Sequence, residues 1–329
     1  MNLLDKPSTS ETLHPLDIAR KAKELLAKRE NTEITKLVTN ICIGKQTEDD
    51  ESPNRLYESF KTHFPNLLIV KLLQVYRSKT ISCVRSHTLT LLDSILEDLE
   101  FSGKELKTEA LLDIKEQLNA CLLLHQETDF KLLSRIVSRV SVDLFINNIS
   151  WDELCDFIID EDDERELVMF SELPSLLDEA FLDRLLEDGL QGKIVNRLRN
   201  PGSDGDWCLG LESGFGLVLQ ASNLKRRDVI GDMVYEIVKS VKEREKETLV
   251  RKGLWLLVKK VSREAIRFRE ADYENVSRLA TMLKNGQVSD ETKMVVKKIQ
   301  QVLDEKYMGG KELDLGFVES FTQQICLGN

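Results

Sequence analysis

Residues 149–200 read ISWDELCDFIIDEDDERELVMFSELPSLLDEAFLDRLLEDGLQGKIVNRLRN, and this stretch decides the fold. Its apolar residues recur at spacings of three and four, beginning with Trp151, Leu154, Phe157 and Ile158. Such spacing places apolar side chains on one face of a helix, whereas a half-buried strand would need strict alternation. The stretch therefore predicts short amphipathic helices joined by short loops.

The same spacing continues outside this stretch. Examples are the apolar residues Leu111, Ile114, Leu118 and Cys121, followed by Leu132, Ile136, Val140 and Leu144. Five of the six prolines, Pro15, Pro53, Pro65, Pro174 and Pro201, stand where helices should begin or connect. Proline is tolerated in the first turn of a helix but breaks its interior. The whole chain therefore reads as all-α.

Helices of this length can bury their apolar faces in a bundle or in a solenoid. A bundle would need long helices with a sustained heptad pattern, which the sequence lacks. HEAT and armadillo solenoids repeat every ~40–47 residues, so we expect a right-handed α-solenoid of about seven or eight helix pairs. Residues 1–329 should form this single solenoid, with a candidate seam at 200–206 between repeats in 1–199 and repeats in 207–329.

The net charge of −11 comes from one segment. Residues 151–190 contain 15 acidic residues and two arginines, which gives this segment a net charge of −13. An acidic chain argues against general nucleic-acid binding, because neutralising phosphates requires a basic face. Six scattered cysteines without a C-x-x-C motif do not form a disulfide framework, and no apolar run suits a signal peptide or membrane span. We therefore expect a cytoplasmic or nuclear protein without membrane contact.

Residues 149–200 resemble a HEAT repeat of the importin-β superfamily of nuclear transport receptors. The matching residues are Trp151, Leu154, Phe157 and Ile158 at the start of the first helix, and Val168, Phe170 and Leu173 in the helix that follows. The chain is also similar to an uncharacterised plant group of armadillo-type proteins related to importins. The resemblance implies a superhelical scaffold whose concave face holds a protein or peptide cargo, with Ran-pathway components as partners. Residues 1–130 show no counterpart of the Ran-binding repeats, so a structural adaptor without a transport cycle stays an alternative.

The acidic run, residues 160–164, is the candidate protein-binding site. It consists of Asp160, Glu161, Asp162, Asp163 and Glu164. Clustered carboxylates raise the local potential and the rate at which a basic partner associates. The alternative is a solvated loop whose carboxylates favour the start of the next helix. An EF-hand is excluded because Arg165 occupies the position that requires glycine.

Catalytic and metal-binding patterns are weak. All four histidines precede residue 126, and the stretch from Gly210 to Gly216 lacks the Lys-Ser/Thr of a phosphate-binding loop. Cys83 with His87 and Cys121 with His125 repeat one helical spacing, which would suit zinc but fits equivalent core positions of two repeats better. A basic helix between Trp255 and Phe268 is more typical of a solenoid core helix than of a calmodulin-target or membrane-surface helix. We therefore expect no enzyme, no cofactor and no metal.

Overall fold

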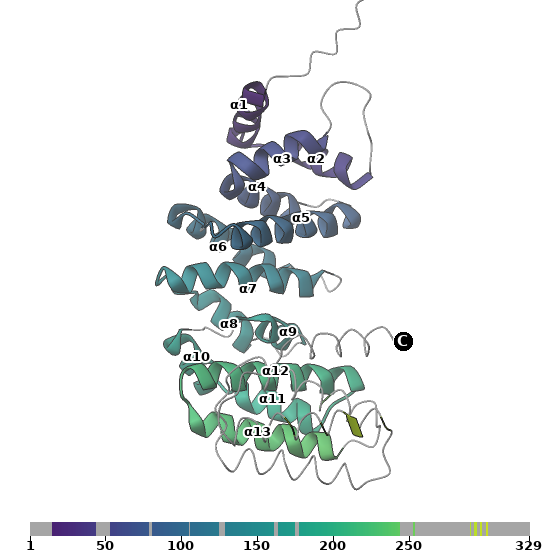
Figure 1. Ribbon diagram of the computed structural model, residues 1–329, viewed down its shortest axis with the longest axis vertical. Helices are drawn as coiled ribbons and strands as arrows, with labels where there is room; N and C mark the ends of the chain where they lie inside the picture. The colour runs from purple at the N-terminus through teal and green to yellow at the C-terminus, as the bar shows by residue number, and fades with distance from the viewer. Residues whose placement is uncertain are drawn as a thin grey trace, which may run out of the picture. The chain divides into compact units, whose positions relative to one another are not determined.

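The computed structural model describes residues 15–43, 53–78, 81–104, 106–124, 129–160, 164–174 and 178–243, together with six single residues beyond them. These residues form thirteen helices and no strand, which confirms the all-α prediction for the described part (Figure 1). No helix among them is long and apolar enough to cross a membrane. In chain order the helices are α1 (Pro15–Ala27), α2 (Thr32–Ile43), α3 (Pro53–His63), α4 (Pro65–Arg77), α5 (Ser82–Phe101), α6 (Thr108–Leu122), α7 (Phe130–Ile146), α8 (Asp152–Asp160), α9 (Glu164–Glu172), α10 (Glu179–Glu187), α11 (Leu190–Arg199), α12 (Asp204–Asn223) and α13 (Arg227–Lys242).

The chain divides into two compact units, Met1–Leu154 and Cys155–Asn329, with the boundary inside α8. The candidate seam at 200–206 lies within the second unit. Residues 200–203 link α11 to α12 there, and Asp204 already belongs to α12. Residues 200–203 are therefore a short connection between two packed helices.

In the first unit, helices alternate between two layers. In one layer, α4 packs against α6. In the other layer, α5 contacts both α2 and α7. Helices α4 and α5 contact each other across the layers. The apolar faces predicted from the sequence meet between the layers, where Leu72, Leu92, Ile114 and Ile136 are fully buried. Each helix thus covers the apolar face of its neighbours, which is how helical-repeat arrays build a continuous core.

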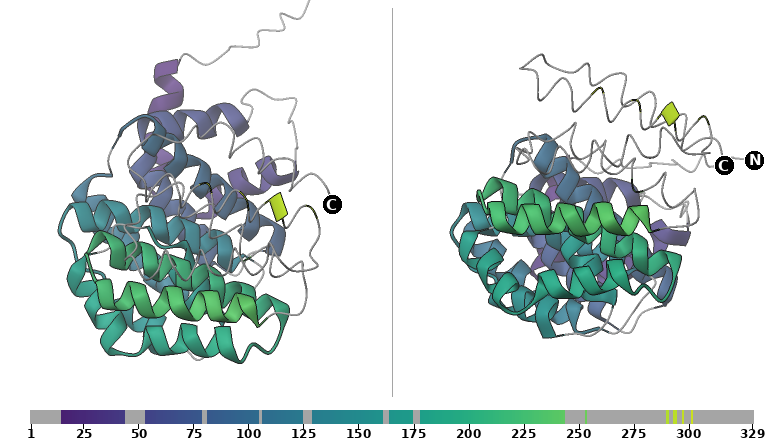
Figure 2. Two further views of the ribbon diagram at one scale, coloured as in Figure 1. Left: turned by 60° about the horizontal axis from the view of Figure 1, so that its bottom comes forward. Right: turned by 90° about the horizontal axis from the view of Figure 1, so that it is seen from below.

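In the second unit, α12 is the central helix. It contacts α9, α11 and α13, and Figure 2 shows α12 and α13 running side by side. A β carbon at Gly210 would lie 3.1 Å from Cβ of Arg197, and one at Gly214 would lie 3.2 Å from Met233 and Ile237. The glycine-rich stretch from Gly210 to Gly216 therefore lies within α12, where α11 and α13 pack closely against it.

Several polar contacts between helices join residues 40 to 46 positions apart in the sequence. In the first unit, Arg77 donates to Gln117 over 40 residues and Ser86 donates to Asp129 over 43 residues. In the second unit, Ser213 donates to the carbonyl oxygen of Leu167 over 46 residues. These separations match the period of HEAT and armadillo repeats, so the described helices are compatible with a helical-repeat solenoid. The handedness and the number of pairs stay predictions.

Glycine ends two helices where the backbone turns left-handed. Gly189 follows α10, has φ of +93° and donates its N–H to the carbonyl oxygen of Leu186. Gly103 follows α5 with φ of +63°. A residue with a β carbon is strained in this conformation. At Gly189 the chain therefore leaves α10 and enters α11 within two residues, which sets the position of the basic side chains of α11.

Candidate functional site

The acidic run lies at the junction between α8 and α9. Asp160 is the last residue of α8 and Glu164 is the first residue of α9. The side chain of Asp160 and all of residues 161–163 lie outside the described residues. The Glu164 side chain is 65% exposed, and its Oε1 lies 3.8 Å from Nη1 of Arg197. One member of the predicted site therefore faces a cation of the same chain.

Arg197 is shared between two carboxylates. Its Nη1 also donates to Oδ1 of Asp206 over 2.8 Å. A side-chain hydrogen bond with Glu164 lowers the pKa of Asp206, and the positive charge of Arg197 acts in the same direction. Helices α9, α11 and α12 thus each contribute one charged residue to a cluster of two carboxylates and one guanidinium.

The other two cations of α11 also face acidic partners. Lys193 Nζ donates to the carbonyl oxygen of Ile159 over 2.6 Å and to Oε2 of Glu166 over 2.8 Å. Arg199 Nε donates to Oε2 of Glu236 over 2.8 Å, and this hydrogen bonding lowers the pKa of Glu236. Glu166 and Glu236 are buried, so their charges are compensated within the fold.

The two arginines inside the acidic segment are engaged as well. The guanidinium of Arg165 is buried and lies 5.4 Å from the centre of the Phe157 ring, within the range of a cation–π contact. Arg184 of α10 pairs with Asp156 of α8. All five cations in residues 151–200 therefore have a partner. The same residues contain 15 acidic side chains, so their net charge is −10.

Four further exposed carboxylates lie in and around α10. Asp178, Glu179, Glu187 and Asp188 are exposed, and none of these four has a cationic partner among the described residues. Glu179, Asp183 and Glu187 follow one another at spacings of four, so they share one face of α10. Among the described residues, the ion pair on that face is the one between Asp183 and Arg226, which directly precedes α13. We call Asp178, Glu179, Glu187 and Asp188 the α10 carboxylates.

The residues that carry the resemblance to a HEAT repeat belong to the core. Trp151, Leu154, Ile158 and Phe170 are fully buried, and Phe157 is nearly so, which confirms the predicted apolar faces. Trp151 stands immediately before α8, and its Nε1 donates to Oδ1 of Asn119 over 2.6 Å. These residues position the helices beside the acidic run and do not themselves offer a binding surface.

The structure describes only part of the Cys/His pairs and none of the basic helix that the sequence suggested. Cys83 is exposed, whereas Cys121 is buried and burial raises its pKa to about 12. His125 and the basic helix between Trp255 and Phe268 lie outside the described residues. In the part that is described, no three His, Cys, Asp or Glu side chains are grouped as metal ligands.

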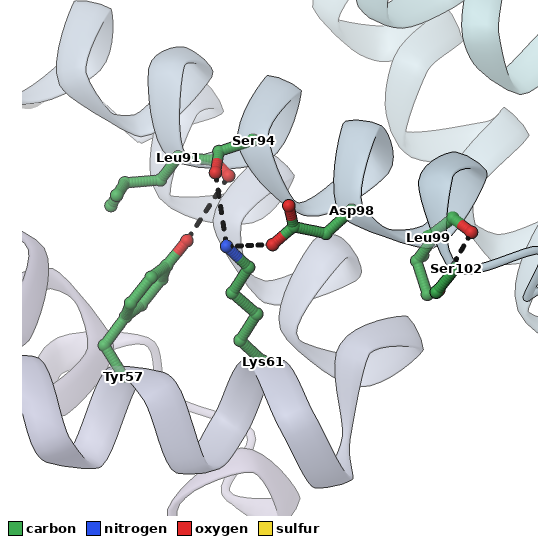
Figure 3. A network of polar contacts seen from close by, with 7 residues as sticks. All are labelled: Tyr57, Lys61, Leu91, Ser94, Asp98, Leu99 and Ser102. Atoms are coloured by element: carbon green, nitrogen blue, oxygen red, sulfur yellow. Dashed lines mark hydrogen bonds and ion pairs between the residues drawn. The ribbon is translucent and has the colours of Figure 1, made fainter.

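A second polar network joins α3 to α5 in the first unit (Figure 3). Tyr57 donates its hydroxyl to the carbonyl oxygen of Leu91 over 3.3 Å, and burial raises the pKa of Tyr57. Lys61 donates to Oγ of Ser94 over 3.3 Å and pairs with Asp98. Every polar group in this network has a partner, so we interpret it as a clamp between two helices.

The pairing of α11 with the acidic segment was missed by sequence reasoning. A signal was present, because three cations occur within the ten residues 191–200 that follow a segment with a net charge of −13. Lys193 and Arg197 are also four residues apart and thus share a helix face. The segment 151–190 ends just short of these cations, so its net charge does not include them.

Comparison with known proteins finds a match to a repeat family but points to no activity. Residues 111–271 match a family described as a repeat of unknown function, DUF577. No curated protein matches the sequence. Two engineered proteins solved by the Northeast Structural Genomics Consortium are similar. One is 14% identical with a TM-score of 0.32, covering 88% of this chain and 97% of its own. The other is 12% identical with a TM-score of 0.36, covering 91% and 93%.

Proposed function

We propose that this protein is a non-enzymatic, importin-β-like helical-repeat scaffold that binds a basic protein or signal peptide. The binding residues are the acidic run and the α10 carboxylates. One observation carries the proposal: all five cations of residues 151–200 are engaged within the fold, yet a net charge of −10 is left. Cations outside these residues meet part of this charge, as Lys115 does for Glu153 and Arg226 for Asp183. The α10 carboxylates, which have no cationic partner among the described residues, are available to a partner of opposite sign.

The exposure of these carboxylates defines how they act. Exposed charges stay hydrated until a partner binds, and they attract an oppositely charged partner from a distance. They therefore contribute more to the association rate than to the final affinity. Their field is screened over about 8 Å at physiological ionic strength. Glu164 contributes less than its neighbours, because Arg197 already faces it.

The α11 pairs favour a second candidate, a structural adaptor without a transport cycle. Glu164 and Glu166 both face cations of α11, which gives part of the acidic segment a role in holding helices together. An adaptor would use the same scaffold without releasing its partner in response to Ran. The two candidates therefore differ in a property that can be measured.

The first experiment measures association of a fluorescently labelled lysine- and arginine-rich peptide by stopped-flow anisotropy. The site variant carries Asp178→Asn, Glu179→Gln, Glu187→Gln and Asp188→Asn. The control variant carries Glu97→Gln on α5 and Glu109→Gln, Asp113→Asn and Glu116→Gln on α6, so it also removes four exposed carboxylates that have no cationic partner among the described residues. We expect slower association only for the site variant. Equal slowing in both variants would assign the effect to net charge and contradict the proposed site.

The second experiment adds Ran in its GTP form to the peptide complex. Release of the peptide supports the transport-receptor proposal. Peptide binding that is unaffected by Ran supports the adaptor. A protein that binds neither basic peptide nor Ran contradicts the transport-receptor proposal and the acidic site together.

A further inference from the structure

Two cysteines from different helices meet at the contact between α2 and α5. Cys42 lies in the last turn of α2, and Cys83 lies in the first turn of α5. Cys42 Sγ is 3.8 Å from the carbonyl oxygen of Cys83. Burial raises the pKa of Cys42, and a side-chain hydrogen bond with Cys83 adds to this rise. The Cys42 thiol thus contacts the Cys83 residue although the two are 41 residues apart in the sequence.

The other described cysteines have different surroundings. Cys121 and Cys155 are buried in the core of their units, and Cys208 is a half-buried residue of α12 in the second unit. Cys83 is exposed and Cys42 is half-buried. Among the described thiols, Cys83 is therefore the one most accessible to a small reagent, and Cys42 is its neighbour.

We propose that Cys42 and Cys83 form a reversible disulfide by exchange with a low-molecular-weight disulfide such as oxidised glutathione. The Cys83 thiolate attacks one sulfur of the reagent, the reagent's S–S bond breaks, and the first thiol leaves with the proton that Cys83 gave up. The Cys42 thiolate then attacks Cys83 Sγ in the mixed disulfide, and the second thiol leaves with the proton from Cys42. The protein loses two electrons and two protons, and the reagent is reduced to two thiols.

The exposure of each thiol assigns the order of these steps. Exchange requires access to the attacking sulfur, and Cys83 provides that access. The second step is intramolecular, so it is favoured by the nearness of Cys42 rather than by the concentration of reagent. The product is a covalent link between α2 and α5. A cross-link between residues so far apart restricts the unfolded chain and raises the stability of the first unit.

The test uses the full-length protein. Reduced protein is incubated with oxidised glutathione under native conditions, quenched with acid, and analysed by intact mass and by peptide mapping. We expect the mass to fall by two hydrogen atoms, a linked peptide that contains Cys42 and Cys83, and full reversal by dithiothreitol. The oxidised protein should also melt at a higher temperature than the reduced protein.

Variants identify the steps. Cys42→Ser should trap glutathione on Cys83, which adds one glutathione to the mass, and Cys83→Ser should abolish the link. The control Cys208→Ser should form the link as the wild type does. Wild-type protein that carries glutathione on Cys83 but never links it to Cys42 would overturn the proposal. The same conclusion follows if the Cys42–Cys83 link is no more abundant in folded protein than among the cysteine pairs formed in urea. Both of these readouts use wild-type protein, so they stand even if a variant fails to fold.

Discussion

Trp151 and Asn119 form a hydrogen bond between the start of α8 and the last turn of α6, with the indole N–H donating over 2.6 Å. The Trp151 side chain has no exposed surface. Burying an indole is favourable only when its N–H finds an acceptor, because an unpaired buried donor has lost its water. This bond therefore allows a large aromatic ring to be fully buried where α8 begins, with its N–H bound to α6.

We expect Trp151→Ala to lower the free energy of unfolding by about 3–5 kcal/mol, because it leaves a large cavity. Asn119→Ala should cost less, about 1–3 kcal/mol, since it removes only the acceptor of a buried donor. Urea denaturation followed by circular dichroism measures both. Glu116→Ala, an exposed position on the same helix, should stay within about 0.5 kcal/mol of wild type. An Asn119→Ala protein as stable as this control would show that the hydrogen bond contributes nothing.

Close packing at α12 predicts an order of effects for three glycines. A methyl group at Gly210 would meet Cβ and the backbone of Arg197, whereas one at Gly214 would meet the flexible ends of Met233 and Ile237. We expect Gly210→Ala to destabilise by about 1–3 kcal/mol and Gly214→Ala by less, since side-chain ends can move. Gly192→Ala on α11 meets no atom within 4 Å and should be neutral or stabilise by up to about 1 kcal/mol. Thermal melts of the three variants test this order, and a stabilising Gly210→Ala would contradict it.

The Arg199–Glu236 pair predicts a dependence of stability on pH. Hydrogen bonding from Arg199 holds the pKa of Glu236 below its ordinary value of 4.5. The stabilisation from this carboxylate is therefore complete above that value and is lost as pH falls through the lower pKa of the folded state. The difference in urea midpoint between wild type and Glu236→Gln should be largest at about pH 7 and should narrow at about pH 3. Asp232→Asn, an exposed change on the same helix, is the control for removing one negative charge from α13. A Glu236→Gln difference that does not vary with pH would mean that the pair is not coupled to folding.

The clamp between α3 and α5 predicts two effects of different size. Tyr57→Phe removes a hydrogen bond from a buried hydroxyl and should cost about 0.5–1.5 kcal/mol. Asp98 is 59% exposed, so a double-mutant cycle of Lys61→Met and Asp98→Ala should give a coupling energy below about 1 kcal/mol. Chemical denaturation of the four proteins in the cycle and of Tyr57→Phe supplies these values. If the coupling energy of Lys61 and Asp98 is well above the loss of unfolding free energy in Tyr57→Phe, the ion pair is the main contact of the clamp.

The acidic run predicts a dependence of binding on salt. We expect Asp160→Asn, Asp162→Asn and Asp163→Asn together to slow the association of a basic peptide and to flatten its dependence on ionic strength, because fewer charges remain to be screened. Stability should change by no more than about 0.5 kcal/mol per site. Stopped-flow traces at several salt concentrations provide the rates. A triple variant that binds at the wild-type rate, with the wild-type salt dependence, would identify the run as a solvated turn.

The helices could be predicted from the sequence because their signals are local. Pro15, Pro53 and Pro65 each begin a helix, and Gly189 ends one, as the chemistry of these residues predicts. The spacing of apolar residues likewise needs only neighbours within two turns. Element type, several helix ends and the buried face around Trp151 therefore follow from local sequence alone.

The contacts between helices could not be predicted in the same way. Which carboxylate Arg197 faces depends on α9, α11 and α12 being neighbours, and no local pattern specifies that. The role of Gly210 depends on the same packing. The unit boundary inside α8 is also hidden, because the apolar spacing runs through it without interruption.

The repeat-length contacts have a consequence for how the chain folds. Bridging side chains join residues no more than 46 positions apart in the contacts described above, as in Arg197 with Asp206, Lys193 with Glu166 and Ser213 with Leu167. A low contact order of this kind requires the closure of short loops only, and chains with local contacts fold quickly. Each helix pair can then serve as a template for the next, so growth of the array can start at any well-packed pair and spread in both directions.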